Sequence, residues 1–273
     1  MKLNRSQFTL RYPAIMGVCN VTKDSFSDGG LNYRKKDALK SIKLMLKNGA
    51  SIIDIGAESA RPGSDPISYK EEIKRLEPIL KILPKNKFLI SIDTYKIETQ
   101  EFALSCGVHI INDIFGGSKD LFVLSKKYNN GLVLMHTPAP PKIMQQKTTA
   151  YKDVVEDIKK FFNQKLKQTD KAKIPQNKIW FDPGIGFGKN LKQNLLIFKH
   201  IKKYKLQKCG LLLGSSRKSW ISAINTSPIE KRLGGSIASV LYCLNQGVDI
   251  LRVHDVFETR QAIEVYKKIS CSR

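Results

Sequence analysis

Eight short apolar runs recur along the chain, and each is followed by a longer segment with helical periodicity. The runs occupy residues 14–19, 51–57, 88–93, 109–113, 131–136, 178–182, 210–214 and 249–254. They are continuously apolar rather than alternating, which is typical of parallel strands that are covered on both faces. In the segments between them, apolar residues recur at three- and four-residue spacing, as in Leu39, Ile42 and Leu46. That spacing predicts helices with one apolar face.

This alternation predicts an α/β fold, a (β/α)8 TIM barrel. The chain has 273 residues, and barrels of this kind take about 250 residues. A doubly wound open sheet is the alternative. Because no proline- or serine-rich linker interrupts the pattern, we expect residues 1–273 to form one domain. Residues 137–147 contain three prolines, which prevent a helix, so we expect a loop at the mouth of the fifth strand.

The chain is strongly basic, with 47 Lys and Arg against 24 Asp and Glu and a formal net charge of +23. Clustered cations bind nucleic acid by neutralising phosphates. These lysines are instead spread over the polar sides of the helical segments, and interleaved aromatic residues that stack on bases are missing. We therefore expect no nucleic-acid partner, with a basic nucleic-acid-binding protein as the alternative from another class. A positive field would also attract an anionic small substrate.

The sequence predicts a cytoplasmic protein without a membrane partner. No window approaches the roughly 20 apolar residues that cross a bilayer, and the first residues lack the layout of a signal peptide. The five cysteines are scattered and never form a C-x-x-C motif. That distribution indicates a reducing compartment, with neither a disulfide framework nor a zinc site.

Polar side chains follow all eight apolar runs at their C-terminal ends. They are Asn20, Glu58, Arg61, Asp93, Asn112, Asp113, His136, Asp182, Ser216, Arg217, Lys218, Arg252 and His254. Any one of them could simply end a strand or cap a helix. Because this end of a barrel carries the active site, the convergence of all eight predicts an enzyme.

Asp93, Asn112 and Asp182 would project into the barrel mouth from three strands. An acid beside an amide suits a planar heterocycle, since one carboxylate accepts two parallel N–H bonds. The alternative is that the acids are N-caps of the following helices. The DPGIGFGKN motif that starts at Asp182 lacks the ending of a phosphate-binding Walker loop. Its glycines would let the backbone approach a flat ligand, with Phe187 available to pack on the ligand face.

Cationic groups are predicted at the same end. Arg252 and His254 follow the last strand, and loops after the last two strands of barrels often bind phosphate. Arg61 could add a further donor, with a surface ion pair as its alternative. Lys218 stands at a predicted helix start, where it could donate to a ligand carbonyl or ring nitrogen. Asn20 could ligate Mg²⁺, which takes few protein ligands beside phosphates and waters.

The motifs that carry these residues resemble dihydropteroate synthases, in order and over nearly the whole chain. They read MGVCNVTKDSFSDGG, GASIIDIGAESARPGS, SIDTYK, INDIFGG, LMHTPAPPKIMQ, FDPGIGFGKN, GSSRKS and ILRVHDV. The resemblance implies a (β/α)8 barrel that joins 4-aminobenzoate to 6-hydroxymethyl-7,8-dihydropterin diphosphate. The products would be pyrophosphate and 7,8-dihydropteroate, for folate synthesis. It also implies a homodimer, with segments around 230–246 and 256–269 as the candidate interface. The alternative is that the apolar faces of these segments are simply buried on the barrel.

The resemblance also implies roles residue by residue. It implies that the pterin is bound by Asp93, Asn112, Asp182 and Lys218. It implies that Arg252 and His254 bind the diphosphate and that Asn20 binds Mg²⁺. The mobile loops and the aminobenzoate pocket would contain Arg61, Phe26, Asp28 and Phe187. Of these, we expect Lys218, Arg252, His254 and Asp28 to act in the reaction. The implied mechanism is dissociative: the diphosphate leaves first, and the aromatic amine captures a pterin methylene cation. Electrostatics and positioning would then lower the barrier.

Three positions depart from the family pattern. Lys23 replaces a usual proline, Ala57 a glycine and Ala60 a threonine. Ala60 removes a hydroxyl group beside Arg61, and we hypothesise that this alters sensitivity to sulfonamides, which mimic aminobenzoate. An Ala60→Thr variant with unchanged sulfonamide inhibition and aminobenzoate KM would contradict that hypothesis. A pterin-binding methyltransferase module is the alternative enzyme, although it would not need the loop at residues 20–30.

Overall fold

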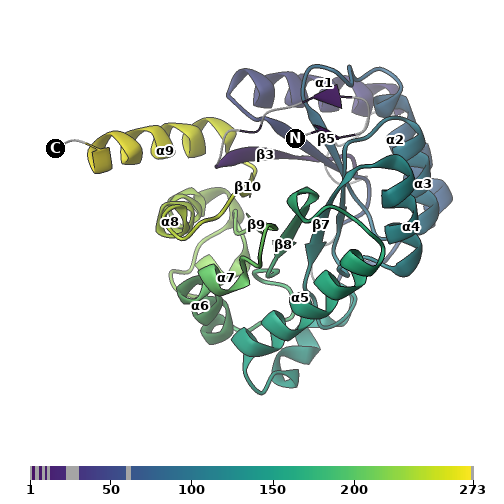
Figure 1. Ribbon diagram of the computed structural model, residues 1–273. Coiled ribbons are helices and arrows are strands. Elements are labelled where there is room, and N and C mark those ends of the chain that lie inside the picture. The colour runs from purple at the N-terminus through teal and green to yellow at the C-terminus, as the bar shows by residue number, and fades with distance from the viewer. Residues whose placement is uncertain are drawn as a thin grey trace.

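The computed structural model describes residues 2–3, 6–7, 10, 13–22, 31–59 and 63–271 of the chain. Within them, eight parallel strands close into a barrel, and helices surround it (Figure 1). The predicted (β/α)8 fold is confirmed, and the open-sheet alternative is wrong. A separate two-stranded ribbon, β1 (Lys2–Leu3) with β2 (Ser6–Gln7), precedes the barrel.

The barrel strands match the predicted apolar runs to within one residue at each end. They are β3 (Ala14–Asn20), β4 (Ile52–Gly56), β5 (Leu89–Asp93), β6 (Ile110–Asp113), β7 (Gly131–Met135), β8 (Ile179–Asp182), β9 (Gly210–Leu213) and β10 (Ile250–Val253). Each pairs in parallel with the next, and β10 returns to β3 with Ile250 opposite Ala14. Closure leaves the barrel without an edge strand to be covered.

Helices follow the strands as the periodicity predicts. They are α1 (Leu31–Lys47), α2 (Tyr69–Leu80), α3 (Ile97–Ser105), α4 (Lys119–Tyr128), α5 (Val154–Lys171), α6 (Leu191–Lys199), α7 (Ser219–Ser222), α8 (Leu233–Leu244) and α9 (Val256–Cys271), with the 3-10 helices η2 (Met144–Ala150), η3 (Gln176–Lys178), η4 (Ile201–Tyr204) and η5 (Ile229–Lys231). Apolar faces hold them on the barrel: Phe162 of α5 stacks on Phe181 of β8 with ring centroids 4.6 Å apart. In the described part of the chain, no helix combines the length and apolar character that a membrane span requires.

The prediction for residues 137–147 needs a correction. The last four of these residues begin η2, so the stretch is not wholly irregular. The physical reason is the position of the prolines. Pro138, Pro140 and Pro141 all lie before this helix and therefore do not interrupt its hydrogen bonds.

The barrel interior changes from apolar to polar along the strands. Its lower layer is a cluster of buried residues, Ala14, Met16, Ile52, Leu89, Ile110, Val133, Trp180, Leu212 and Ile250. Side chains on a strand alternate between the two faces, so the next inward position lies two residues further on. At that position five of the eight strands carry a polar side chain, Asp54, Ser91, Asn112, Asp182 and Arg252, and the other three carry Val18, Met135 and Gly214. The apolar layer thus closes the barrel from below, and a polar layer lies above it at the C-terminal ends.

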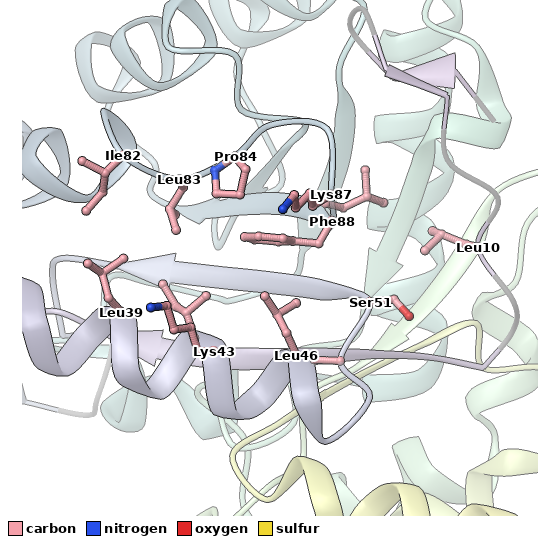
Figure 2. A pocket seen from close by; sticks show the side chains of 13 residues that line it. Leu10, Leu39, Lys43, Leu46, Ser51, Ile82, Leu83, Pro84, Lys87 and Phe88 are labelled. Carbon is pink, nitrogen blue, oxygen red and sulfur yellow. The ribbon is translucent and has the colours of Figure 1, made fainter.

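A cavity of about 830 Å³ lies at the opposite end of the strands (Figure 2). Its lining is mainly apolar and comes from α1 and from residues 82–89, with Leu39, Leu46 and Phe88 among its side chains. Within the described residues, its lining includes none of the predicted site residues. The N-terminal face of such barrels serves stability rather than catalysis, and the active site is expected at the C-terminal end.

Candidate active site

Arg252 lies in the barrel mouth between two carboxylates from other strands. Its Nε donates to Oδ2 of Asp54 at 2.7 Å, and its Nη2 donates to Oδ2 of Asp93 at 2.7 Å. Nδ2 of Asn112 donates to the same Asp54 oxygen at 3.1 Å. The structure therefore brings together three predicted residues, Asp93, Asn112 and Arg252, and adds Asp54, which was not predicted.

Asp54 is the site residue that sequence reasoning missed. It stands within the apolar run of β4, and its side chain is fully buried. A signal was present, because a lone acid inside a buried strand is strongly unfavourable unless a cation and hydrogen bonds compensate it. The sequence did not show which cation this was, since Arg252 lies 198 residues away along the chain.

Asp93 has an environment that favours its neutral form. Burial raises the pKa of Asp93 to about 7, although the Arg252 guanidinium group favours the ionised form. The carboxyl group can therefore hold or release a proton near neutral pH. Such a group can pair with either a donor or an acceptor atom of a heterocyclic ring.

Asp182, Phe187 and Lys218 form the neighbouring part of the site. Oδ1 of the buried Asp182 accepts from the Gly184 N–H at 2.8 Å. Burial raises the pKa of Asp182, and the Lys218 ammonium group opposes the rise. Nζ of Lys218 donates to the Ile185 carbonyl at 2.6 Å and lies 4.5 Å from the centre of the Phe187 ring. Burial also lowers the pKa of Lys218 to about 8.

Two glycines keep space open beside these groups. A Cβ atom at Gly214 would lie 3.5 Å from Oδ2 of Asp182 and 3.9 Å from Cβ of Arg252. A Cβ atom at Gly56 would lie 3.5 Å from both Oδ1 of Asn20 and Cβ of Asp93. Asp182 and Arg252 therefore border the same space, and Asn20 stands beside Asp93 at the mouth.

The glycine loop after β8 encloses an ammonium group of its own. Nζ of the buried Lys189 donates to the carbonyl oxygens of His136, Gly184 and Phe187 at 3.2, 3.0 and 2.8 Å. Burial lowers the pKa of Lys189 to about 7, while three acceptors match the three donors of a protonated amine. Gly184 has φ +68°, and a Cβ there would come within 2.1 Å of the His136 oxygen. At Gly184 the glycine thus serves the turn around Lys189; whether the loop's glycines also admit a ligand stays a prediction.

His254 and Arg217 occupy the exit of β10 and the approach to α7. Nδ1 of His254 lies 3.1 Å from Oγ of Ser216, and its ring is exposed to solvent at the mouth. Partial desolvation and the nearby Arg252 and Arg217 guanidinium groups lower the pKa of His254, so it is neutral at pH 7. Arg217 itself is paired with Asp255, with its Nε 2.9 Å from Oδ2.

The acids of the site are not helix caps. The N-cap of α3 is Lys96, that of α4 is Ser118 and that of α6 is Asn190. This excludes the alternative for Asp93 and Asp182. Instead, Asp93 accepts from Arg252 and Asp182 accepts from the Gly184 N–H.

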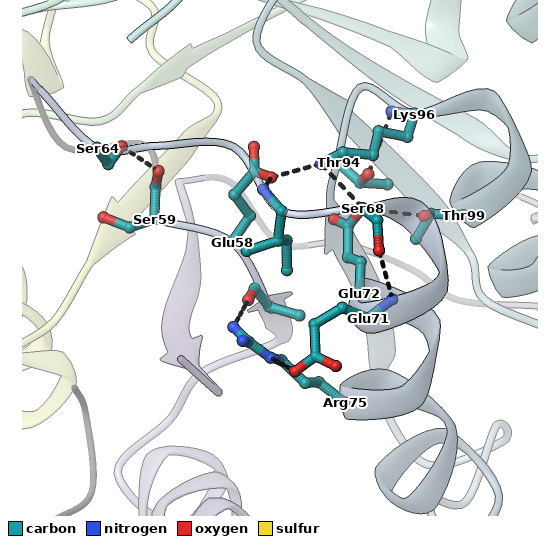
Figure 3. A network of polar contacts seen from close by, with 12 residues as sticks. Glu58, Ser59, Ser64, Ser68, Glu71, Glu72, Arg75, Thr94, Lys96 and Thr99 are labelled. Carbon is teal, nitrogen blue, oxygen red and sulfur yellow. Dashed lines mark hydrogen bonds and ion pairs between the residues drawn. The ribbon is translucent and has the colours of Figure 1, made fainter. Parts of the chain in front are cut away.

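A charge network holds the loop after β4 at both ends (Figure 3). Oε2 of Glu58 accepts from the Ile67 N–H at 2.7 Å and from Nζ of Lys96 at 2.5 Å. The same Nζ lies 3.3 Å from Oε2 of the buried Glu72, to which Thr99 donates at 2.9 Å. Burial raises the pKa of Glu72, while Lys96 and Thr99 oppose the rise. The network ties this loop to the segment that follows β5.

Five predicted positions lie outside the described residues: Lys23, Phe26, Asp28, Ala60 and Arg61. Their assigned roles stay predictions. Asn20 is described, at the end of β3, where it offers one amide oxygen. Among the described residues, no group of three or more His, Cys, Asp and Glu side chains is placed to hold a metal ion.

Known proteins resemble this chain over most of its length. The family model described as pterin binding enzyme matches residues 16–254. The dihydropteroate synthase of Escherichia coli K12 is 40% identical, over 94% of this chain and 91% of that protein. The structure of Yersinia pestis dihydropteroate synthase with a sulfonamide drug has a TM-score of 0.90 and 35% identity, over 100% and 99% of the two chains. The Burkholderia cenocepacia enzyme, complexed with 7,8-dihydropteroate, has a TM-score of 0.87 and 32% identity, over 98% and 95%.

Proposed function

The chain belongs to the dihydropteroate synthase family of pterin-binding enzymes, and from that membership we propose its reaction in detail. It joins 4-aminobenzoate to (7,8-dihydropterin-6-yl)methyl diphosphate and releases 7,8-dihydropteroate and pyrophosphate. The observation that carries the proposal is the group of acids, amide and cations above the apolar layer, centred on Arg252 between Asp54 and Asp93. Such a set suits a nitrogen heterocycle that bears an anionic leaving group.

The pterin ring would lie among Asp93, Asn112, Asp182 and Lys218. The Asp182 carboxylate can accept two parallel N–H bonds from a ring that carries an amino group. Lys218 can donate to the ring carbonyl once its Nζ leaves the Ile185 carbonyl, which accepts from it at 2.6 Å. Phe187, which lies under Lys218, offers an apolar face for the ring.

The diphosphate would lie toward Arg252 and His254 at the end of β10. A guanidinium group has five N–H donors, and the two carboxylates that contact Arg252 leave others for phosphate oxygens. His254 is exposed at the mouth and neutral. An approaching dianion would raise its pKa, so the imidazole could gain a proton as the leaving group binds.

The reaction needs no covalent nucleophile from the protein. The bond between the pterin methylene carbon and the diphosphate oxygen breaks, and its electron pair leaves with pyrophosphate. The methylene cation is delocalised over the ring, where the Asp93 and Asp182 carboxyl groups tolerate positive charge. The amine nitrogen of aminobenzoate then forms the new bond and loses one proton to water. Orientation of the two substrates supplies the rest of the rate enhancement.

Asn20 fits one ligand position for Mg²⁺. A single amide oxygen at the mouth, with no group of three or more His, Cys, Asp and Glu side chains among the described residues placed to hold a metal ion, matches an ion that binds mainly to substrate phosphates and waters. When bound, Mg²⁺ would neutralise charge on the departing diphosphate.

We propose a homodimer that acts in the cytoplasm. Exposed apolar side chains lie on the last two helices, where Tyr242, Phe257, Val265 and Ile269 are 54, 52, 53 and 70% exposed. Figure 1 shows α9 reaching away from the barrel beside α8. Exposed apolar surface of this kind favours a partner surface. The side chains of Cys19, Cys106, Cys209 and Cys243 are free thiols, which suits a reducing compartment.

The direct test is pyrophosphate release from the pterin diphosphate in the presence of 4-aminobenzoate and Mg²⁺. Formation of dihydropteroate, identified by its mass, would support the proposal. A folded protein that releases no pyrophosphate would contradict it. The alternatives, a methyltransferase module and a nucleic-acid-binding protein, both predict that negative result.

A further inference from the structure

Asp54 accepts two hydrogen bonds with one oxygen atom. Oδ2 receives Nε of Arg252 at 2.7 Å and Nδ2 of Asn112 at 3.1 Å. Oδ1 has no hydrogen-bond partner among the described residues. The side chain is fully buried, whereas those of Arg252 and Asp93 retain 19 and 16% exposure. Asp54 therefore lies beneath the residues that face the mouth.

We propose that Asp54 is a positioning residue for the pterin, because its carboxylate decides which atoms of Asn112 and Arg252 face the ligand. This inference rests on the proposed function. It assigns Asp54 no contact with substrate. The residue acts through the two side chains that it holds.

The orientation of Asn112 follows from the chemistry of a carboxylate. A carboxylate has only acceptor atoms, so the amide must turn its Nδ2 toward Asp54. The carbonyl oxygen Oδ1 of Asn112 then remains for the ligand. Asp54 thereby makes Asn112 an acceptor, which selects a ring N–H at that position over an unprotonated ring nitrogen.

The orientation of Arg252 is determined in the same way. Its guanidinium group is planar, and two of its nitrogens are engaged by carboxylates on β4 and β5. Two fixed contacts define the plane, which leaves Nη1 for the substrate. Without Asp54, Asp93 would be the one carboxylate among the described residues that still accepts a hydrogen bond from the group.

Packing alone does not explain an acid at this position. The inward neighbour two residues earlier on β4 is the apolar Ile52, and an apolar side chain at residue 54 could extend the same layer. Well-packed apolar residues often replace buried ion pairs without loss of stability. An acid here is therefore better explained by what it holds than by the fold.

The test compares Asp54→Leu, Asp54→Asn and a matched control, Ser91→Ala. Ser91 is opposite Asp54 in register on β5, is equally buried, and its hydroxyl has no partner among the described residues. Loss of a charged hydrogen bond typically weakens binding by tenfold or more. We expect Asp54→Leu to raise the KM for the pterin diphosphate about tenfold or more, and Asp54→Asn about threefold, since asparagine keeps an acceptor oxygen.

The KM for 4-aminobenzoate should stay within about twofold in both variants, and Ser91→Ala should change neither constant by more than that. A general loss of structure would instead affect both substrates. Equal rises in the two KM values, or an unchanged pterin KM, overturn the inference. If Asp54→Leu fails to fold, Asp54→Asn decides by the same criterion. A wild-type protein without turnover overturns the proposed function, whereas an active wild type with unaffected Asp54 variants overturns this inference alone.

Discussion

Replacing Asp93 by asparagine tests the electrostatics of the site through the stability of the fold. Burial raises the pKa of Asp93 from 3.8 to about 7, although Arg252 contacts the carboxylate at 2.7 Å. Between these two pH values the folded protein keeps the proton and the unfolded chain has released it. Folding therefore becomes less favourable as the pH rises through this range. The stability that the protonated group contributes in acid is lost as the pH passes about 7.

The magnitude follows from the difference between the two pKa values. About 3 pKa units at about 1.4 kcal/mol each correspond to about 4 kcal/mol, an upper bound. Asparagine has the shape of the protonated acid and cannot ionise. Asp93→Asn should therefore lie close to the wild type near pH 4 and gain up to about 4 kcal/mol in free energy of unfolding at about pH 8.

Urea denaturation at a series of pH values, followed by the fluorescence of Trp180 and Trp220, measures this difference. Measurements in acid serve as an internal control, because both side chains are then neutral. Pyrophosphate release should fall in the same variant, since the amide cannot offer a carboxylate to the pterin. Parallel stability curves for the two proteins would refute the reasoning, because they would mean that Asp93 releases its proton at the same pH in the folded protein and in the unfolded chain.

Three further predictions concern parts of the molecule around this centre. Lys189→Met removes three hydrogen bonds to carbonyl oxygens, so we expect the free energy of unfolding to fall by about 3 kcal/mol in urea denaturation; an unchanged value would show that the loop holds its shape without the ammonium group. Glu58→Gln should lower stability by about 2 kcal/mol, because its ion pair with Lys96 is largely buried. The matched control Glu77→Gln, which breaks an exposed pair on α2, should change stability by less than about 0.5 kcal/mol, and equal effects would contradict this ranking. Chelation should abolish pyrophosphate release and added Mg²⁺ should restore it, with Asn20→Ala requiring more Mg²⁺ for half-maximal rate; full activity after chelation would exclude the metal.

The polar residues near the strand ends show where sequence reasoning was sufficient. Asp93 and Asp182 end their strands, and Asn112 is the next-to-last residue of β6. The apolar runs of these strands are long enough to identify, and parallel strands bring their C-terminal ends to one side. Their convergence could therefore be predicted from the strand ends alone. The alternative that these acids cap helices had to be excluded by the structure, because a cap depends on where a helix starts. The residue at which a helix starts is the least certain part of a helix predicted from apolar spacing.

Asp54 and Lys189 show where sequence reasoning was not sufficient. Both are charged side chains in buried surroundings, one paired with Arg252 across the barrel and one enclosed by carbonyls of two loops. Sequence patterns show which residues are apolar and at what spacing they recur. They do not show which buried charged side chains contact each other, because those contacts depend on how the barrel closes.

The sequence by itself determined the strands, the helices, the barrel and the end of the barrel at which the polar side chains gather. Those features follow from local periodicity, which repeats every two residues in a strand and every 3.6 in a helix. Only the tertiary structure decided the partners within the site: Asp54 with Arg252 and Asn112, Glu58 with Lys96, and Arg217 with Asp255. These pairs join residues far apart along the chain. A buried charge takes whichever partner the closed barrel brings within hydrogen-bonding distance, and that partner is set by three-dimensional closure rather than by spacing.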